Sequence, residues 1–324
     1  MLTETDRHRP KLLVLVGPTA VGKTKLSLTL AEEYNAEIIS GDSMQVYRGM
    51  DIGTAKASPE ELTRVKHHMI DIHDPDHPFS VAEFQERCVS LIRDIDSRGK
   101  LPFIVGGTGL YVESVCYDYR FSEGGSDEAF RAEQEAYAEA FGAEVLHERL
   151  RQIDPESAQR LHPNDRRRII RALEIFHMTG ERLSDQLKTQ KKQTPYELCI
   201  VGLTMDRALL YKRIEERIDL MLEQGLVEEV RGLLAKGYGP SFVSMQGLGY
   251  KEIAAYLQGE YSLEGAVDLL KKNTRHFAKR QLSWFRHMKD IAWVDMSEME
   301  GFTTQLNQIR AIIADKLTFG VNHF

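Results

Sequence analysis

The sequence predicts an α/β fold, in which a doubly wound parallel sheet forms the core and an all-helical subdomain is inserted into it. Two observations predict the sheet: short apolar runs alternate with long helical patterns, and a glycine-rich loop follows the first run. A third observation predicts the insertion. The stretch from about 121 to 194 has almost no β-branched runs and is rich in Glu, Ala, Arg and Leu, which is typical of helices.

The first elements are a strand, a glycine loop, a helix and a second strand. Residues 11–16 are a short apolar run that ends at the glycine loop, as a buried parallel strand does. Apolar residues then recur every four positions from Leu26 to Tyr34, which predicts a helix. The next apolar run, 36–39, predicts a second strand that leads into Asp42.

The remaining core elements continue this alternation. A helix begins at Ser80, and Glu83 three residues later gives the pattern of a capping box. Its apolar stripe consists of Phe84, Cys88, Leu91 and Ile95. Residues 101–105 predict a third strand, and 198–203 and 291–294 are further strand candidates.

The length of the chain suits a large core with an insertion. Its 324 residues, 42% hydrophobic and 28% charged, have the composition of a globular protein. Polar stretches at 123–126 and 191–195 mark the ends of the helical region. We therefore assign 1–120 together with 196–324 to an α/β P-loop core, and 121–195 to the helical insertion.

The composition also restricts the compartment and the partners. No apolar run approaches the ~20 residues that span a bilayer, and the polar N-terminal segment lacks an export signal. We expect a cytoplasmic protein with no membrane partner. Cys88, Cys116 and Cys199 lie far apart without a CxxC pair, so we expect them to fill the core. The net charge of -7 argues weakly against general coating of nucleic acid, although basic clusters lie at 166–171 and 271–289.

The glycine loop matches the P-loop motif GxxxxGK(S/T). It consists of Gly17, Pro18, Thr19, Ala20, Val21, Gly22, Lys23 and Thr24, between the first strand and the first helix. Backbone N–H groups of such a loop point at phosphate oxygens, the lysine adds a positive charge, and the hydroxyl of Thr24 can hold Mg²⁺. The motif predicts phosphate binding, for which nucleotide hydrolysis or phosphoryl transfer is the usual purpose.

A second acidic position distinguishes among these uses. A hydrolytic P-loop protein usually carries an aspartate at the end of a further strand, but residues 103–105 run into Gly106 and Gly107 instead. The acid that follows a strand near the P-loop is Asp42. A turn or helix-cap aspartate is the alternative interpretation of Asp42.

Seven blocks, taken together and in order, resemble the bacterial tRNA dimethylallyltransferase family. They are GPTAVGKT at 17–24, SGDSMQVYRGMDIGTAK at 40–56, GGTGLY at 106–111, HPND at 162–165, RALE at 171–174, GLGYKE at 247–252 and TRHFAKRQ at 274–281. The resemblance covers nearly the whole chain. Three cysteines do not suffice for the C-terminal zinc finger of the eukaryotic relatives, so the bacterial form fits.

The resemblance implies transfer of a dimethylallyl group from its diphosphate to N6 of the adenosine on the 3′ side of the anticodon, with Mg²⁺. It implies that Asp42 is the base that takes the proton of the amine, and that Thr108 lies near the reaction channel. Arg213 and Arg217 lie four apart on a predicted helix. By resemblance Arg217 holds the diphosphate, although pairing with Glu216 or Glu223 is the plain alternative.

The partners implied are dimethylallyl diphosphate and the anticodon stem-loop of a tRNA, and we expect a monomer. Residues expected to contact tRNA in the core are Asp42, Ser43, Met44, Gln45, Arg275, Lys279, Arg280 and Gln281. Those in the helical insertion are Arg131, Arg167, Arg168, Ile169, Ile170 and Arg171. For each basic cluster a solvated helix face is the alternative. At helical spacing Trp284 and Phe285 are expected in the core.

Three other functions compete with this prediction. A small-molecule P-loop kinase, with Asp42 activating an acceptor hydroxyl, predicts ATP turnover. A prenyltransferase that acts on free adenine nucleotides is the second alternative, and the helical insertion with its cluster of arginines argues against it. A non-catalytic RNA-binding protein with a nucleotide switch would tolerate the loss of Asp42.

Overall fold

The computed structural model describes residues 9–121, 125–190, 193–298 and 301–318. Within these ranges the chain forms two compact units. The core unit comprises Met1–Cys116 and Thr194–Phe324, and the helical unit is Tyr117–Gln193. The polar N-terminal segment up to residue 8, and parts of the stretches that mark the ends of the insertion, lie outside the described residues.

The core unit contains a six-stranded sheet whose strands are all parallel, in the order β3-β2-β4-β1-β5-β6. The strands are β1 Lys11–Val16, β2 Ala36–Gly41, β3 His67–His68, β4 Leu101–Gly106, β5 Glu197–Thr204 and β6 Ile291–Asp295. The α/β fold and the five predicted strands are confirmed. The sequence pattern missed β3 because two residues are too few to show a period.

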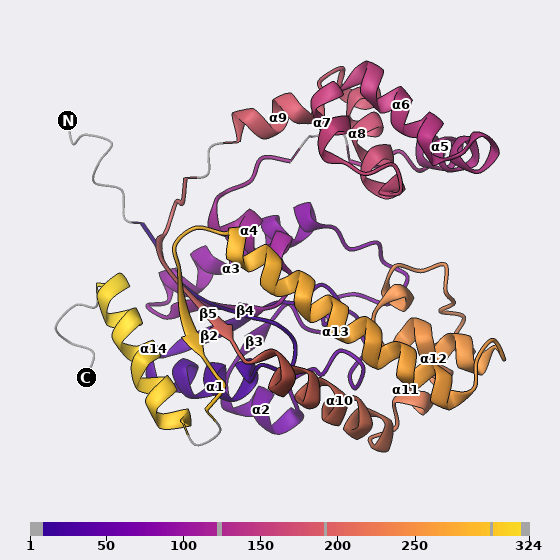
Figure 1. Ribbon diagram of the computed structural model, residues 1–324. Coiled ribbons are helices and arrows are strands. Elements are labelled where there is room, and N and C mark those ends of the chain that lie inside the picture. Colours follow the sequence, from indigo (N-terminus) through magenta and orange to yellow (C-terminus); the bar gives the residue numbers. More distant parts are fainter. Residues whose placement is uncertain (1–8, 122–124, 191–192, 299–300, 319–324) are drawn as a thin grey trace, which may run out of the picture. The chain divides into compact units, whose positions relative to one another are not determined.

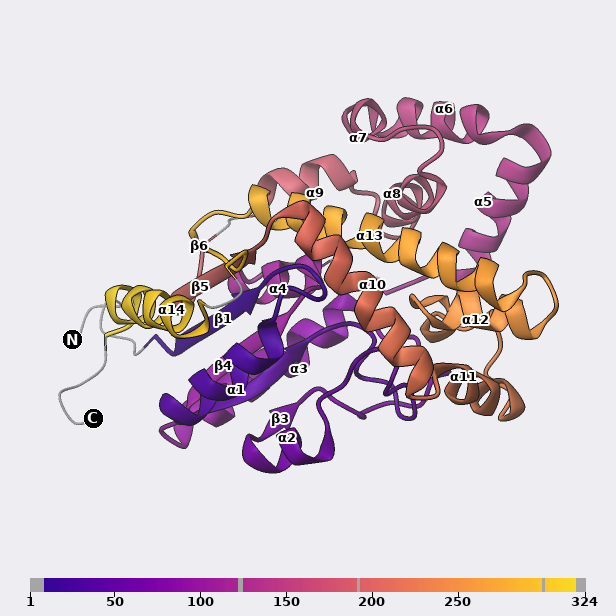
Figure 2. The same cartoon turned by 60° about the horizontal axis from the view of Figure 1, so that its bottom comes forward.

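Helices lie on both sides of this sheet (Figures 1 and 2). Helix α1 packs on β1, β2 and β4, helices α3 and α4 on β4, and α14 on β5 and β6. The helices are α1 Lys23–Glu33, α2 Pro59–Arg64, α3 Val81–Ser97, α4 Gly109–Cys116, α10 Arg207–Glu223, α11 Leu226–Ala235, α12 Tyr250–Leu257, α13 Leu263–His287 and α14 Phe302–Lys316. This is the arrangement of a doubly wound sheet.

Strand β1 is the centre of the core. It lies between β4 and β5, and its residues from Leu12 to Val16 are at most 1% exposed. A run of Leu and Val suits a strand that is covered on both faces. The three cysteines are also buried and form no disulfide, which confirms that they fill the core.

Helix α3 begins as predicted but differs in two details. Ser80 Oγ accepts a hydrogen bond from the backbone N–H of Glu83 at 3.1 Å, so the N-cap is present. The carboxylate of Glu83 does not complete the capping box, because it binds His73, His77 and Arg87 instead. The buried stripe contains Ile92 in place of Leu91.

The helical unit consists of five helices, and no strand occurs among its described residues. They are α5 Glu128–Phe141, α6 Ala143–Ile153, α7 Pro155–Arg160, α8 Arg166–Thr179 and α9 Leu183–Thr189. Their apolar faces meet in a core that includes Leu146, Leu150, Ile169 and Leu173. No helix in the described part of the chain is long and apolar enough to cross a membrane.

Candidate active site

The register of the sheet brings three loops to one edge. Val16 on β1 and Gly41 on β2 both pair with Gly106 on β4, so the three strands end at the same level. The P-loop, Asp42 and Thr108 therefore emerge side by side. A side chain at Gly106 would collide with β2, because its Cβ would lie 2.4 Å from the backbone of Gly41. Glycine permits this close approach.

The P-loop joins β1 to α1, as its motif predicts. Gly22, directly before the helix, has φ of 109°, a conformation that only glycine adopts readily. Lys23 Nζ donates to the carbonyl oxygens of Gly17 at 2.9 Å and Pro18 at 2.8 Å. Arg217 Nη1 on α10 lies 3.4 Å from Thr19 Oγ1 and donates to it. Arg217 thus points at the P-loop rather than at the glutamates of its own helix.

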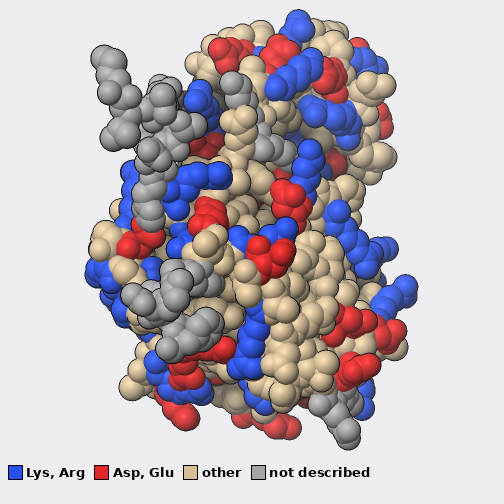
Figure 3. Space-filling view, turned by 90° about the vertical axis from the view of Figure 1, so that its left-hand side faces the viewer, with Lys and Arg blue, Asp and Glu red and all other residues tan. Residues whose placement is uncertain are grey.

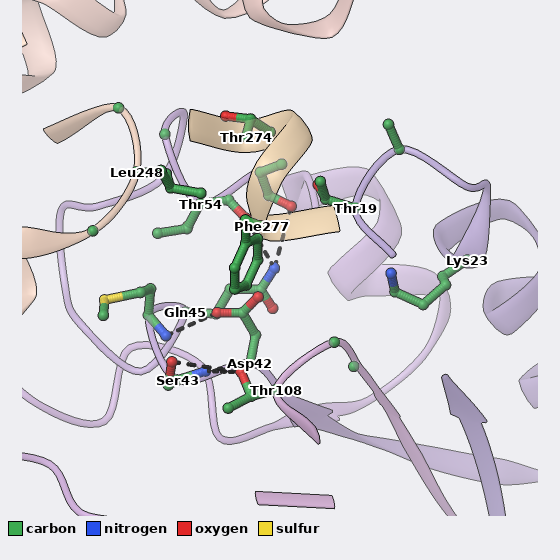
Figure 4. Close-up of a pocket in the computed structure, with 18 of the residues that line it drawn as sticks. Thr19, Lys23, Asp42, Ser43, Gln45, Thr54, Thr108, Leu248, Thr274 and Phe277 are labelled. Atoms are coloured by element: carbon green, nitrogen blue, oxygen red, sulfur yellow. Dashed lines mark hydrogen bonds between the residues drawn. The ribbon is translucent and has the colours of Figure 1, made fainter. Parts of the chain in front are cut away.

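Asp42 and Thr108 lie on adjacent loops of the same edge (Figure 4). Asp42 Oδ1 accepts from the backbone N–H of Met44 at 2.8 Å, which fixes the loop after β2. Thr108 Oγ1 accepts from the backbone N–H of Ser43 at 3.2 Å. The carboxylate and the hydroxyl are therefore both anchored near the cavity described below.

Burial dominates the electrostatics of this edge. It lowers the pKa of Lys23 to about 7, helped by the positive charge of Arg217 and opposed by Asp42. Burial also raises the pKa of Asp42, although the N–H of Met44 and the charge of Lys23 oppose the rise. A carboxylate with a raised pKa is a stronger base than an ordinary aspartate. The positive charges of Lys23 and Arg217 favour the ionised form of the Asp42 carboxylate.

These groups line a single cavity of about 660 Å³ within the core unit. Figure 4 shows Lys23 on one side of it and Phe277 of α13, Leu248 and Thr274 on others. Apolar side chains complete the lining: Ile214, Ile218, Met221, Leu248 and Phe277. The cavity therefore combines a cationic end with an apolar wall, as a small apolar diphosphate requires.

The cavity also offers oxygen ligands for a hard cation. The hydroxyl of Thr24 and the carboxylate of Asp42 both line it. Hydroxyl, carboxylate and phosphate oxygens are the donors that Mg²⁺ prefers, usually with several waters retained. The residues present therefore fit a magnesium ion that is bound together with a diphosphate.

Two glutamines from the predicted RNA contacts are held by the protein itself. Gln281 is 6% exposed, and its amide accepts from Thr19 N at 2.9 Å and donates to Gly107 O at 3.0 Å. It joins the P-loop to the loop after β4 and also lines the cavity, so it has a positioning role, while its contact with RNA stays a prediction. Gln45 accepts from Ser40 Oγ at 2.7 Å and donates to the carbonyl of Thr54, yet it still lines the cavity.

The basic cluster on α13 is partly neutralised by α10. Arg275 pairs with Glu215 at 2.5 Å and Lys271 with Asp219 at 2.6 Å. Arg275 therefore bridges the two helices, while its contact with RNA stays a prediction. Lys279 and Arg280 are exposed, and Arg280 also lines the cavity. On the face shown in Figure 3, basic side chains are likewise interspersed with acidic ones.

Several residues predicted to contact RNA in the helical unit also have structural roles. Glu174 is fully buried, and Arg131 and Arg171 bind its carboxylate at 2.8 and 2.6 Å. Ile169 and Ile170 pack in the core of the unit, so their side chains are not available to RNA. Arg167 and Arg168 are exposed and keep the role that the sequence suggested.

Sequence reasoning missed the residue that shapes the loop after Met50. Glu229 on α11 accepts hydrogen bonds from the backbone N–H groups of Asp51, Ile52 and Gly53, at 2.9, 2.8 and 3.2 Å. The hydroxyl of Tyr250 also donates to it at 2.6 Å. A glutamate in a helix far along the chain carries no pattern that signals this contact.

The aromatic pair on α13 divides between core and surface. Phe285 is fully buried, as expected. Trp284 is 38% exposed, and its indole N–H donates to Glu113 at 3.0 Å. The expectation of a core position was therefore wrong for Trp284, whose ring only partly covers α4.

Comparisons with known proteins identify the family of this chain. The sequence model described as IPP transferase matches residues 45–288. A tRNA dimethylallyltransferase of Geobacillus thermodenitrificans is 51% identical over 96% of this chain and 99% of its own length. One from Bacillus cereus is 55% identical over 90% of this chain and 92% of its own length.

Solved structures give the same result. The full-length tRNA isopentenylpyrophosphate transferase of Bacillus halodurans has a TM-score of 0.72 and 48% identity, and the match covers 95% of this chain and 97% of that one. A eukaryotic dimethylallyltransferase acting on tRNA has a TM-score of 0.80 and 30% identity, with 96% and 81% covered. The relatives compared above are tRNA dimethylallyltransferases, and the chain therefore belongs to the IPP transferase family.

Proposed function

We propose that this protein transfers a dimethylallyl group from dimethylallyl diphosphate to N6 of the adenosine on the 3′ side of a tRNA anticodon. The observation that carries the proposal is the single cavity in which Asp42 faces a P-loop and its lysine. A phosphate-binding loop supports a diphosphate leaving group, and a carboxylate across from it supports deprotonation of an amine.

The chemical step forms one bond and breaks another. The lone pair of N6 forms a bond to C1 of the dimethylallyl group, while the C1–O bond breaks and its electron pair moves to the diphosphate. Lys23, Arg217 and the N–H groups of the P-loop stabilise the negative charge that develops on the departing oxygen. The proton that N6 loses passes to the carboxylate of Asp42.

Magnesium fits this scheme as a partner of the leaving group. Thr24 would hold the ion beside the diphosphate, and Asp42 lines the same cavity. A bound Mg²⁺ neutralises charge on the diphosphate oxygens. The apolar wall formed by residues such as Leu248 and Phe277 suits the dimethylallyl group and excludes water from it.

The tRNA is held by groups around the mouth of this cavity and by the helical unit. An unpaired loop base leaves its stack at the lowest cost, so an adenosine in the anticodon loop is a suitable target. Ser43, Met44 and Gln45 line the cavity next to Asp42 and would contact the base. The exposed Lys279, Arg280, Arg167 and Arg168 would bind phosphates.

Incubation of the protein with Mg²⁺, dimethylallyl diphosphate and unmodified tRNA tests the proposal. After digestion to nucleosides, mass spectrometry should find adenosine with an added isopentenyl group. Free AMP should not be modified, and ATP should not be turned over. Modified AMP would favour the prenyltransferase of free nucleotides, release of ADP would favour the kinase, and absence of any product would refute the proposal.

The remaining expectations concern the state of the protein. We propose a monomer that acts in the cytoplasm, where an anticodon loop is available as substrate. Light scattering during size-exclusion chromatography should give a mass near the 37.0 kDa of one chain. A mass of about twice that value would show that the protein is a dimer and that the proposed monomeric state is wrong.

A further inference from the structure

Three side chains outside the cavity converge on one point between β3 and α3. His73 Nε2 lies 2.8 Å from one carboxylate oxygen of Glu83, and His77 Nε2 lies 2.8 Å from the other. The two imidazole rings are stacked, with centroids 3.7 Å apart and planes 5° from parallel. In the described part of the chain this is the one group of three His, Cys, Asp or Glu side chains whose ligand atoms all lie within 4.8 Å.

The backbone fixes all three positions. His73 forms a parallel bridge with Tyr47, and its N–H donates to Val46 O at 3.0 Å. The carbonyl of His77 accepts from the Tyr47 hydroxyl at 3.0 Å. Glu83 lies in the first turn of α3. The three residues therefore come from two separately anchored segments.

We propose that His73, His77 and Glu83 bind one divalent transition-metal ion, for which Zn²⁺ is the representative. Two imidazole nitrogens and one carboxylate oxygen are a ligand set that zinc accepts, with water as the fourth ligand. Magnesium and calcium prefer oxygen ligands, so the two histidines favour a transition metal. The site is separate from the catalytic cavity, since none of the three residues lines that cavity.

A metal must lie in the plane of each imidazole that binds it, so the two stacked rings cannot both bind one ion as they stand. His77, the more exposed of the two, must turn out of the stack. The ligand distances must change as well, because the two histidines now contact different oxygens of Glu83. In a tetrahedral zinc site with bonds of about 2.0–2.1 Å, ligand atoms lie roughly 3.3 Å apart. The present separations of 2.8 Å must therefore widen by about half an ångström. His77 has 38% of its side chain exposed, which leaves a path for the ion and for water.

The surroundings support the metal-binding form. Arg87 Nε lies 2.9 Å from Glu83 and can stay as the outer partner that orients a ligating carboxylate. A plain hydrogen-bonded cluster is the alternative, and it predicts no metal binding at all.

A bound ion would link the segment that contains Tyr47 to the first turn of α3. The segment from Val46 to Arg48 directly follows the part of the loop that lines the cavity, and it is hydrogen-bonded to the segment that carries both histidines. The metal would thus have a structural role, and metal loading would stabilise the fold without entering the reaction.

Calorimetric titration of Zn²⁺ into the metal-free, untagged full-length protein tests the proposal, with Mg²⁺ in excess to occupy the catalytic cavity. One ion per chain should bind, and the melting temperature should rise with zinc. His77→Ala and Glu83→Gln should each weaken binding at least about tenfold. His287→Ala, which removes an exposed histidine on α13, should leave the affinity unchanged.

A spectrum adds a readout that does not depend on stability. Co²⁺ bound by two histidines and a carboxylate in a four-coordinate site absorbs strongly in the visible range, and the band should disappear in His73→Ala. Circular dichroism confirms that each variant is folded, and His77→Ala tests the site at its most exposed ligand. Absence of stoichiometric binding, or wild-type affinity in His77→Ala and Glu83→Gln, would overturn the proposal.

Discussion

Proton uptake at Lys23 gives a quantitative test of the P-loop assignment. With a pKa of about 7 in the free protein, Lys23 is about 90% neutral at pH 8 and about 10% neutral at pH 6. A diphosphate in the loop favours the ammonium form and raises this pKa. Binding of dimethylallyl diphosphate should therefore take up about 0.9 proton at pH 8 and about 0.1 at pH 6.

Isothermal titration calorimetry in buffers of different ionisation enthalpy measures this uptake directly. Lys23→Arg keeps a positive charge at all these pH values, so its binding should show no such uptake. Subtracting its result removes protons that the ligand itself exchanges. Lys25 also lines the cavity, but its Nζ lies over the ring of Phe302, 4.3 Å from the centroid, so it is a stringent control. Lys25→Met should keep the uptake of the wild type.

The change in the charge of Lys23 between pH 6 and pH 8 also changes the apparent affinity for dimethylallyl diphosphate. Only about a tenth of the molecules carry a charged Lys23 at pH 8, so the apparent Kd should rise about tenfold relative to pH 6. Lys23→Arg should show a flat profile after correction for the ligand. Equal proton uptake in wild type and Lys23→Arg at pH 8 would refute the reasoning, since the proton would then come from another group.

Three further variants test the assignments at other positions. Gln281→Leu removes two buried hydrogen bonds, so it should cost about 1–3 kcal/mol of stability and leave the salt dependence of tRNA binding unchanged. A double change of Lys279 and Arg280 to Gln should reduce the salt slope of tRNA binding by about 1–2 units in filter binding; an unchanged slope excludes both from the RNA site. Glu174→Gln replaces charged hydrogen bonds by neutral ones and leaves the two arginines partly solvated, so it should destabilise the helical unit by about 1–3 kcal/mol in urea.

Acid should act on the helical unit through Glu174. Burial alone would raise the pKa of this carboxyl, but hydrogen bonds from Arg131 and Arg171 outweigh burial and lower it. The stability contributed by the ion pairs of Glu174 with Arg131 and Arg171 is therefore fully present above the ordinary glutamate pKa. It is lost as the pH falls below that value. Urea melts monitored by circular dichroism should show a loss below about pH 4.5 that Glu174→Gln lacks.

Local patterns predicted most of the sheet and the phosphate loop. The run at β1 and the motif that follows it lie within 14 residues, from Lys11 to Thr24, so neighbouring residues specify them. The hydrogen bonds of Gln281 and Glu229 join positions 262 and 176–178 residues apart. Contacts of that separation follow from the packing of α11 and α13, which no local period reveals.

Charge patterns in the sequence did not reveal which cations pair with buried carboxylates. The sequence shows Arg131 and Arg171 as cations, but not that both surround the buried Glu174. Burying a carboxylate is costly unless cations compensate for it, and these two partly exposed arginines compensate for Glu174. Asp42 differs because its position at a strand end depends only on β2, and topology then places it beside the P-loop.

Transfer by Asp42→Asn in a single turnover tests the central claim most directly. Asparagine keeps an oxygen that can accept from the N–H of Met44, so the loop should be preserved. The account predicts a fall of about 10²–10⁴ in the rate of prenyl transfer to tRNA, with binding of dimethylallyl diphosphate and tRNA nearly unchanged. The control is Asp268→Asn, the same change at an exposed aspartate on α13 outside the cavity, and it should transfer at the wild-type rate. A rate within a few-fold of the wild type for Asp42→Asn would contradict the role of Asp42 as the base.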